Sequence, residues 1–489
     1  MENREFKVVG SQATTLFWVT IGLLLAALST HVMADGPAYS SERFRDRELL
    51  RNKSLRNKLR STKDRVARGQ SDFASNQESL DRYYSKFLFP MMTQTNAIER
   101  VTSNPLGDLA DHRRNLLLDL KNAKSENFHA YLLKRLYSAM KHMVENEKQS
   151  YHPAVRYNAM LILGELNQKE EIPLGSNKSA PDPLPEALEF LRDQFVKENQ
   201  VDSLRVAALV GILRHAELDR LREPPSQPLS AADKLQIAKM LMPLLESQTP
   251  PPNRSMAGHV WMRRRCVEIL AALRLTDESG KVFSAVAGVF DEDGAPADLR
   301  RTAAEAIGQI KLPPKYAANP AELAAKVANL ALEVSSQELG NLDRLQPQTQ
   351  RYTPRNSTPL PTRLPNLDAE DRKSYADSTK KKQDEPESEE EILMTLSRRR
   401  LLTTLISVEK GLSGIQSQVG SEASLDNLHQ SVNGLIRVCS RKSEDASTLY
   451  DDLEKEIRVL RDRLAQLENV PEKPQQATAD NEVAEAPAP

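Results

Sequence analysis

One short pattern constrains the fold of this chain more than any other feature of its sequence. Between residues 115 and 340, an arginine is followed by a small residue three positions later and an aliphatic residue seven positions later, four times over. The arginines that open the four copies are Arg156, Arg205, Arg263 and Arg300. Positions three and seven apart share one face of an α-helix, and a small residue there lets a neighbouring helix approach closely. The pattern predicts helices stacked in layers rather than one thick core.

A second amphipathic helix is expected before each copy of the pattern, at about residues 128–144, 184–196, 237–245 and 282–290. Proline clusters separate the resulting helix pairs. Proline ends a helix because it lacks a backbone N–H and clashes with the preceding turn. No run of alternating hydrophobicity favours a β-sheet. The expected fold class is therefore all-α, built from helical hairpins that proline-rich loops connect.

These patterned helices resemble the second helices of HEAT repeats, in particular the HEAT-like repeats of bacterial proteins. The likeness is best in residues 155–166 and in residues 299–310, where Leu-Arg-Arg-Thr-Ala-Ala-Glu-Ala-Ile-Gly is close to the family pattern. Successive arginines are 49, 58 and 37 residues apart, and only the last step has the usual length. The resemblance implies an α-solenoid over residues 115–345 that binds proteins through its inner helices. The four arginines are expected to be structural residues whose heads bridge adjacent layers.

The first 34 residues have the order of a secretory signal peptide. Arg4 and Lys7 precede an apolar run at residues 16–28, and Val32 and Ala34 suit the two small positions of a cleavage site. The apolar run is shorter than a membrane span of ~20 residues, but the uncharged window up to Asp35 also allows an uncleaved signal anchor. Both alternatives predict an exported protein that is periplasmic, envelope-associated or secreted.

A basic segment, residues 41–68, lies within a charged lead-in region of residues 35–114. It carries eleven basic and four acidic side chains, and its few leucines do not make a wide apolar stripe. A solvated helix or a disordered arm is therefore expected, which could tether the chain to an anionic envelope surface. No aromatic residue lies between Arg45 and Arg68 to stack on bases, and the chain's 67 basic residues are matched by 68 acidic ones. Nucleic acid is therefore not an expected partner.

The composition changes after Leu345. Residues 346–391 have few large apolar residues and predict a disordered linker, and residues 471–489 predict a disordered acidic tail. Residues 392–470 between them predict a helical hairpin followed by a third helix. The apolar residues of that third helix form a four-three seam: Leu453, Ile457, Leu460, Leu464 and Leu467. This seam of about two heptads is short for an isolated coiled coil, so it either packs on its own hairpin or mediates self-association.

The sequence has no local signature of a catalytic, cofactor or metal site. It contains no glycine-rich phosphate loop, no His-Glu-x-x-His, no Cys-x-x-Cys and no Gly-x-Ser-x-Gly, and no two histidines lie four residues apart. Two cysteines cannot form a disulfide framework or a four-thiolate zinc site, and Cys266 is expected to be a buried thiol. We therefore assign no catalytic residue, no cofactor and no metal ligand.

One basic cluster is a candidate for binding an acidic protein partner. Residues 263–265 and 300–301 are all arginine and occupy equivalent positions in successive repeats. Stacked helices would place such positions ~10 Å apart, as a short ladder on one face. Arg264 and Arg301 are the residues expected to contact a partner, and Trp261 is expected in the core or at the rim of that interface.

The preferred interpretation is an exported, non-enzymatic scaffold that binds protein partners along its repeats. One alternative is an envelope tether that uses the basic segment and a self-associating C-terminal coil. A further alternative comes from the resemblance, because bacterial HEAT-like repeats also occur in chromophore-attaching lyases. It would make the chain a lyase or an enzyme-maturation subunit.

Overall fold

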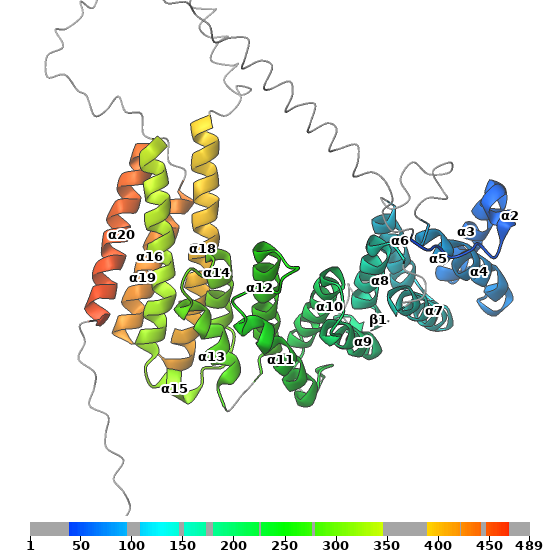
Figure 1. The fold of residues 1–489 in the computed structure, drawn as a ribbon, viewed down its shortest axis with the longest axis horizontal. Helices are drawn as coiled ribbons and strands as arrows, with labels where there is room; N and C mark the ends of the chain where they lie inside the picture. Colours follow the sequence, from blue (N-terminus) through cyan, green and yellow to red (C-terminus); the bar gives the residue numbers. More distant parts are fainter. Residues whose placement is uncertain are drawn as a thin grey trace, which may run out of the picture. The chain divides into compact units, whose positions relative to one another are not determined.

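The computed structural model describes residues 39–94, 108–145, 151–172, 179–223, 226–275, 279–345, 389–420, 422–441 and 446–468. These residues are mostly helical, so the predicted all-α class is confirmed (Figure 1). They belong to two compact units, one ending at Ala187 and one starting at Leu188, which are considered in turn. The predicted signal segment, the tail and most of the predicted linker lie outside the described residues.

The first unit consists of short helices followed by a longer pair. Its elements are α2 (Arg47–Arg51), α3 (Lys53–Ala67), η1 (Ala74–Asn76), α4 (Gln77–Tyr83), the π-helical turn η2 (Tyr84–Leu88), α5 (Phe89–Met92), α6 (Leu109–Lys121), α7 (Glu126–Glu145), α8 (Pro153–Glu165), β1 (Asn167–Lys169) and β2 (Asp182–Pro183). Helices α7 and α8 pack on each other, as the sequence predicted for the first pair, and α3 packs on α4, α6 and α7.

The basic segment is helical over Arg47–Arg51 and Lys53–Ala67, so the disordered-arm alternative is wrong for these residues. Leu49, Leu59 and Val66 are buried, so one side of α2 and α3 belongs to the core of the first unit. The sequence reasoning counted leucines alone. It overlooked that Val66 and Ala67, with the aliphatic parts of Thr62 and Lys63, complete the buried side of α3.

A small β-structure was not predicted. Strands β1 and β2 pair antiparallel, and a further bridge joins Ile172 to Ser179. These elements lie between α8 and α9, and they are two or three residues long. Strands this short cannot display a period of two, which is why the sequence gave no signal for them.

The second unit begins with helices in the predicted order. They are α9 (Pro185–Val196, which starts at the end of the first unit), α10 (Asp202–Arg220), α11 (Ala231–Glu246), α12 (Met256–Leu273), α13 (Lys281–Ala287) with the 3₁₀ turn η3 (Gly288–Asp291), α14 (Ala297–Ile307) and α15 (Pro314–Ala317). The patterned helices pack in succession, α10 on α12 and α12 on α14, while α11 contacts both α12 and α13. Ser230 and Ser255 cap α11 and α12 by accepting backbone N–H groups, which places these starts directly after the proline loops.

The second unit ends in a four-helix bundle. Its helices are α16 (Pro320–Leu345), α18 (Glu389–Val419), α19 (Ala423–Ser440) and α20 (Ala446–Glu468). Helix α16 packs on α18 and α20, and α19 packs on the same two helices (Figure 1). From sequence, residues 115–345 and 392–470 are separate regions. In the structure α16 comes from residues 115–345, yet it packs into one core with the three helices of residues 389–468.

Glycines bring the bundle against the last patterned helix. Helix α14 packs on α18, and the Cα atom of Gly308 lies so close to Gly414 that a Cβ atom at Gly414 would collide with it. Gly411 likewise lies against the backbone carbonyl of Ala304. Across this contact Lys410 Nζ forms an ion pair with Glu305 at 2.8 Å. The C-terminal helices are therefore docked on the patterned helices through backbone contacts that only glycine permits.

Candidate interaction surfaces

Three of the four patterned arginines close the end of a preceding helix. Arg156 Nε and Nη2 donate to the carbonyl of Val144 in the last turn of α7, at 3.3 and 3.1 Å. Arg205 Nη2 donates to the carbonyls of Lys197 and Glu198, just beyond α9. The last carbonyls of a helix have no partner inside it, so a guanidinium that reaches them ties the two helices of a pair together.

Arg263 makes the same contact from a more buried position. Its Nε donates to the carbonyl of Leu245 in the last turn of α11 at 2.8 Å, and its Nη2 pairs with the Glu292 carboxylate. The Arg263 side chain is only 3% exposed. Arg300 departs from the series, because both of its terminal nitrogens bond the Glu333 carboxylate of α16, at 2.6 and 2.7 Å. All four arginines thus hold helices together.

The predicted partner-binding residues come together, but acidic side chains already neutralise them. Arg264 and Arg301 both face the Asp298 carboxylate, at 4.0 and 3.6 Å, and their side chains are 26% and 21% exposed. Arg264 also lies 3.6 Å from Glu268. Asp298 is 70% exposed, so the carboxylate that the two arginines share is itself open to solvent. A partner carboxylate would have to displace Asp298 to reach them.

Trp261 is half-buried and belongs to the same cluster. The Arg265 guanidinium lies 4.8 Å from the centre of its ring, a cation–π contact, and Arg265 also pairs with Glu268 at 2.5 Å. The tryptophan is therefore held at the edge of the ladder by Arg265 and not by Arg264. We call Trp261, Arg264, Arg265, Asp298 and Arg301 the ladder cluster.

The residues of the four-three seam are covered by the chain itself. Leu453, Ile457, Leu460 and Leu464 are buried and Leu467 is half-buried. Helix α20 packs on α19, part of the predicted hairpin, and equally on α16, which was not expected to reach it. The seam is thus occupied within one chain, and self-association through it stays a prediction that would require the bundle to open.

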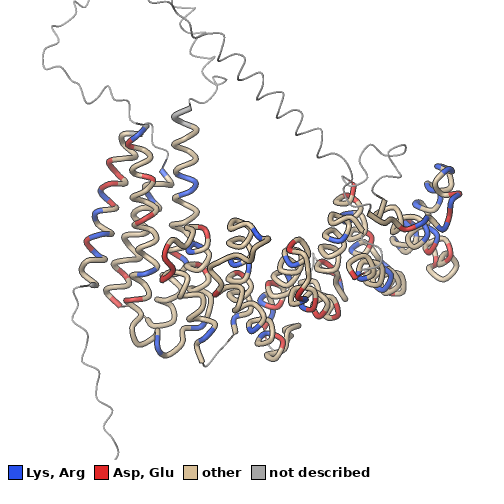
Figure 2. Tube along the Cα trace, viewed as in Figure 1, with Lys and Arg blue, Asp and Glu red and all other residues tan. Residues whose placement is uncertain are grey.

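The strongest charged surface lies on the basic segment. Nine of its eleven basic side chains are exposed: Arg43, Arg45, Arg47, Arg51, Lys53, Lys58, Arg60, Arg65 and Arg68. We call these nine the outer basic surface. Figure 2 shows Lys and Arg following one another along α2 and α3. None of the nine has an ion pair or a side-chain hydrogen bond to another described residue.

The other charges of this segment point inward. Arg56 donates to the carbonyls of Leu49 and Leu50, where α2 ends. Lys63 is buried and pairs with Asp119 of α6, whose other oxygen accepts the Tyr84 hydroxyl at 2.9 Å. Burial alone would lower the pKa of Lys63, but the Asp119 carboxylate raises it above its usual value.

The four acidic side chains of the segment are also engaged. Asp46 and Glu48 both pair with Arg82 of α4, at 2.8 and 3.3 Å. Asp64 pairs with Lys63 at 2.9 Å, and Glu42 accepts the Tyr151 hydroxyl at 3.2 Å. Each of the four carboxylates therefore has a partner, although Glu48 and Asp64 stay 61% and 44% exposed. The nine exposed cations have none among the described residues. The sequence showed the excess of positive charge but not which of these side chains would find a partner, because Arg82, Lys63 and Tyr151 reach the carboxylates through the tertiary fold.

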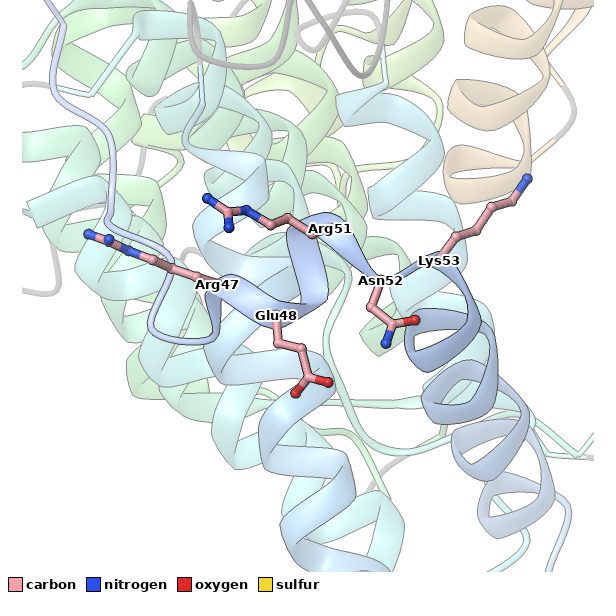
Figure 3. A pocket seen from close by; sticks show the side chains of 5 residues that line it. All are labelled: Arg47, Glu48, Arg51, Asn52 and Lys53. Atoms are coloured by element: carbon pink, nitrogen blue, oxygen red, sulfur yellow. The ribbon is translucent and has the colours of Figure 1, made fainter.

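Two shallow hollows lie on the outer basic surface. One is lined by Arg47, Glu48, Arg51, Asn52 and Lys53, and the other by Asn57, Arg60, Ser61, Asp64, Arg65 and Arg68. In Figure 3, Arg47 and Arg51 extend on one side of α2 while Glu48 and Asn52 extend on the other. The side chains diverge instead of converging on one point. This arrangement suits an extended anionic surface better than a small molecule.

Both cysteines and His215 are buried titratable side chains of the described residues. Within the described ranges no three His, Cys, Asp or Glu side chains come together as a metal site. Cys266 and Cys439 are free and buried, and burial raises the pKa of Cys439 to about 12, so this thiol stays protonated. Burial lowers the pKa of His215 to about 3, which keeps this imidazole neutral.

No described helix is long and apolar enough to cross a membrane. Comparisons with models of protein families, with curated proteins and with solved structures found no match to this chain. The likeness to HEAT repeats therefore rests on the patterned residues alone.

Proposed function

We propose that this chain is an exported, non-enzymatic scaffold that binds protein partners along a solenoid of HEAT-like helix pairs. The observation that carries the proposal is the repeated arginine contact, in which Arg156, Arg205 and Arg263 each cap the helix before their own. A contact that recurs with the sequence pattern marks equivalent structural units. Stacked units of this kind offer long surfaces for other proteins.

The succession of the patterned helices supports the same proposal. Helices α10, α12 and α14 pack one on the next and continue onto α18 of the bundle. In a solenoid such a row would form one layer, with α11 and α13 in the other. The bundle would then cover the last repeat, as a capping element does. Export rests on the basic, apolar and small-residue order of the first 34 residues.

The ladder cluster is the proposed contact site for an acidic segment of a partner. Asp298 acts there as an internal competitor, because it holds Arg264 and Arg301 at distances that are long for ion pairs. An incoming carboxylate could bond both guanidinium groups at shorter range. Trp261 would supply the apolar contact beside them.

The test is capture of partners from envelope extracts by the tagged full chain after mild crosslinking. We expect Arg264→Glu with Arg301→Glu to abolish capture, and Asp298→Asn to increase it by about threefold to tenfold, because a competing charge is removed. Arg399→Glu with Arg461→Glu is the matched control, since both of these arginines are exposed on the bundle. The control should capture the same partners as the unmodified chain.

Two results would overturn the proposal. If the unmodified chain captures no protein, the scaffold function fails. If both double variants capture the same partners, the ladder cluster is not the contact site. A chain that ends at Leu345 is not a clean control, because it would expose the faces of α14 and α16 that α18 and α20 cover. A visible absorption band in the purified protein would instead favour the lyase alternative.

A further inference from the structure

We propose that the outer basic surface binds the headgroup surface of an anionic lipid bilayer. The first observation is that the nine cations of this surface are not neutralised by neighbouring side chains. No described carboxylate pairs with any of them, whereas Asp46, Glu48 and Asp64 are held by Arg82 and Lys63. A surface of unpaired positive charge attracts an anionic layer, and each added cation near such a layer strengthens the attraction.

The second step is the form of the surface. The apolar side chains of α2 and α3 are buried or half-buried, so neither helix exposes a large apolar side chain that could insert between acyl chains. Contact would therefore be by adsorption at the headgroups. Arg47, Arg51 and Lys53 extend in different directions (Figure 3), so each can meet a separate phosphate group. A headgroup layer offers its charges in this spread form.

The third step separates lipid from nucleic acid. Residues 46–68 contain no aromatic side chain on which a base could stack, and stacking is a main source of affinity for single strands. The segment begins seven residues after Ala34, close to the apolar run at residues 16–28. Basic segments beside an apolar segment of this kind are typical sites of contact with anionic lipid.

The experiment measures sedimentation of the full chain with vesicles. One vesicle type is phosphatidylcholine alone, and in the other about a third of the lipid is phosphatidylglycerol. We expect binding to anionic vesicles at ~0.1 M salt and its loss at ~1 M, where the Debye length falls from ~10 to ~3 Å. Neutral vesicles measure whatever the apolar N-terminal segment contributes by itself.

A pair of matched variants locates the binding. Neutralising Arg47, Arg51, Arg60 and Arg65 to Gln should weaken binding to anionic vesicles at least about 100-fold, because each charge contributes about fivefold. The control neutralises four exposed lysines elsewhere, Lys134, Lys239, Lys281 and Lys311, and so changes the net charge equally. The control should weaken binding less than about threefold.

Three outcomes would overturn the proposal. The first is equal binding to neutral and anionic vesicles by the unmodified chain. The second is equal weakening by both quadruple variants, which would mean that only net charge matters. The third is tighter binding to an oligonucleotide than to anionic vesicles at the same salt, which would assign the surface to nucleic acid. Circular dichroism of both variants would show whether they keep the helical fold.

Discussion

Cations have different roles in the basic segment of the first unit and at three arginines of the second unit. In the basic segment of the first unit, nine of eleven basic side chains are exposed and without partners. In the second unit, Arg254, Arg263 and Arg300 bond carboxylates or helix ends, and their side chains are 7%, 3% and 19% exposed. The residue type is the same in both places. The role is decided by whether a carboxylate or an unpaired carbonyl lies within reach of the guanidinium.

The difference shows what a charge count leaves out. A buried cation is stable only when it is paired, and then its loss leaves the partner charge stranded. An exposed, unpaired cation adds almost nothing to stability and can be replaced freely unless something binds it. Position on the helix therefore separates structural cations from those available to a ligand.

The largest effect is expected at Arg263, the buried one of the four patterned arginines. Arg263→Ala should lower the free energy of unfolding of the second unit by about 4 kcal/mol, because Glu292 loses its ion pair and the Leu245 carbonyl loses its donor. Urea titration followed by circular dichroism measures this. The adjacent Arg264→Ala, at a side chain that is 26% exposed, should cost less than about 1 kcal/mol.

An equal loss of unfolding free energy in Arg263→Ala and Arg264→Ala would contradict this difference between buried and exposed arginines. It would mean that the Arg264 contacts with Asp298 and Glu268 hold the fold as firmly as those of Arg263. The ladder cluster would then lose its place as a site open to partners.

A smaller effect is expected inside the basic segment, where Lys63 is the inward exception. Lys63→Met should lower the free energy of unfolding of the first unit by about 3 kcal/mol, since Asp119 would remain buried with only the Tyr84 hydroxyl as a partner. Lys58→Met, at an exposed position of the same helix, should change it by less than about 0.5 kcal/mol. Thermal unfolding of the two variants side by side gives the comparison.

A double variant tests whether the buried Asp119 carboxylate causes the loss of stability in Lys63→Met. This variant, Lys63→Met with Asp119→Leu, should recover most of the lost stability, because no buried charge is left. Failure to recover would mean that the cost comes from packing and not from the stranded carboxylate.

Much of the helical structure follows from sequence because it depends on local rules. The three-seven spacing and the proline clusters located α7 to α14 in the predicted order, although α11 starts at Ala231, six residues before the predicted start. The pattern also singled out Arg156, Arg205, Arg263 and Arg300, which all proved to join helices. The exact partners of these arginines, such as Leu245 for Arg263, depend on how neighbouring helices meet, which local spacing does not specify.

The arrangement of the C-terminal helices could not be predicted. Helix α16 precedes the long segment after Leu345, so its packing with α18 and α20 joins residues far apart in the chain. The close contact of Gly308 with Gly414 has the same origin. A glycine in a sequence does not reveal which backbone will approach it. Likewise, the eleven basic residues of 41–68 predicted a positively charged surface. They did not show which nine side chains would be exposed to solvent.

The unfolding free energy of the first unit, with Arg47, Arg51, Arg60 and Arg65 all replaced by Gln, tests the central claim most directly. The claim is that these cations have no structural role and are therefore available to a ligand. Since none has a partner among the described residues, the free energy should stay within about 0.5 kcal/mol of the original or rise slightly as repulsion is relieved. A loss of about 2 kcal/mol or more would contradict the claim and place these arginines with Arg263 among the residues that hold the fold together.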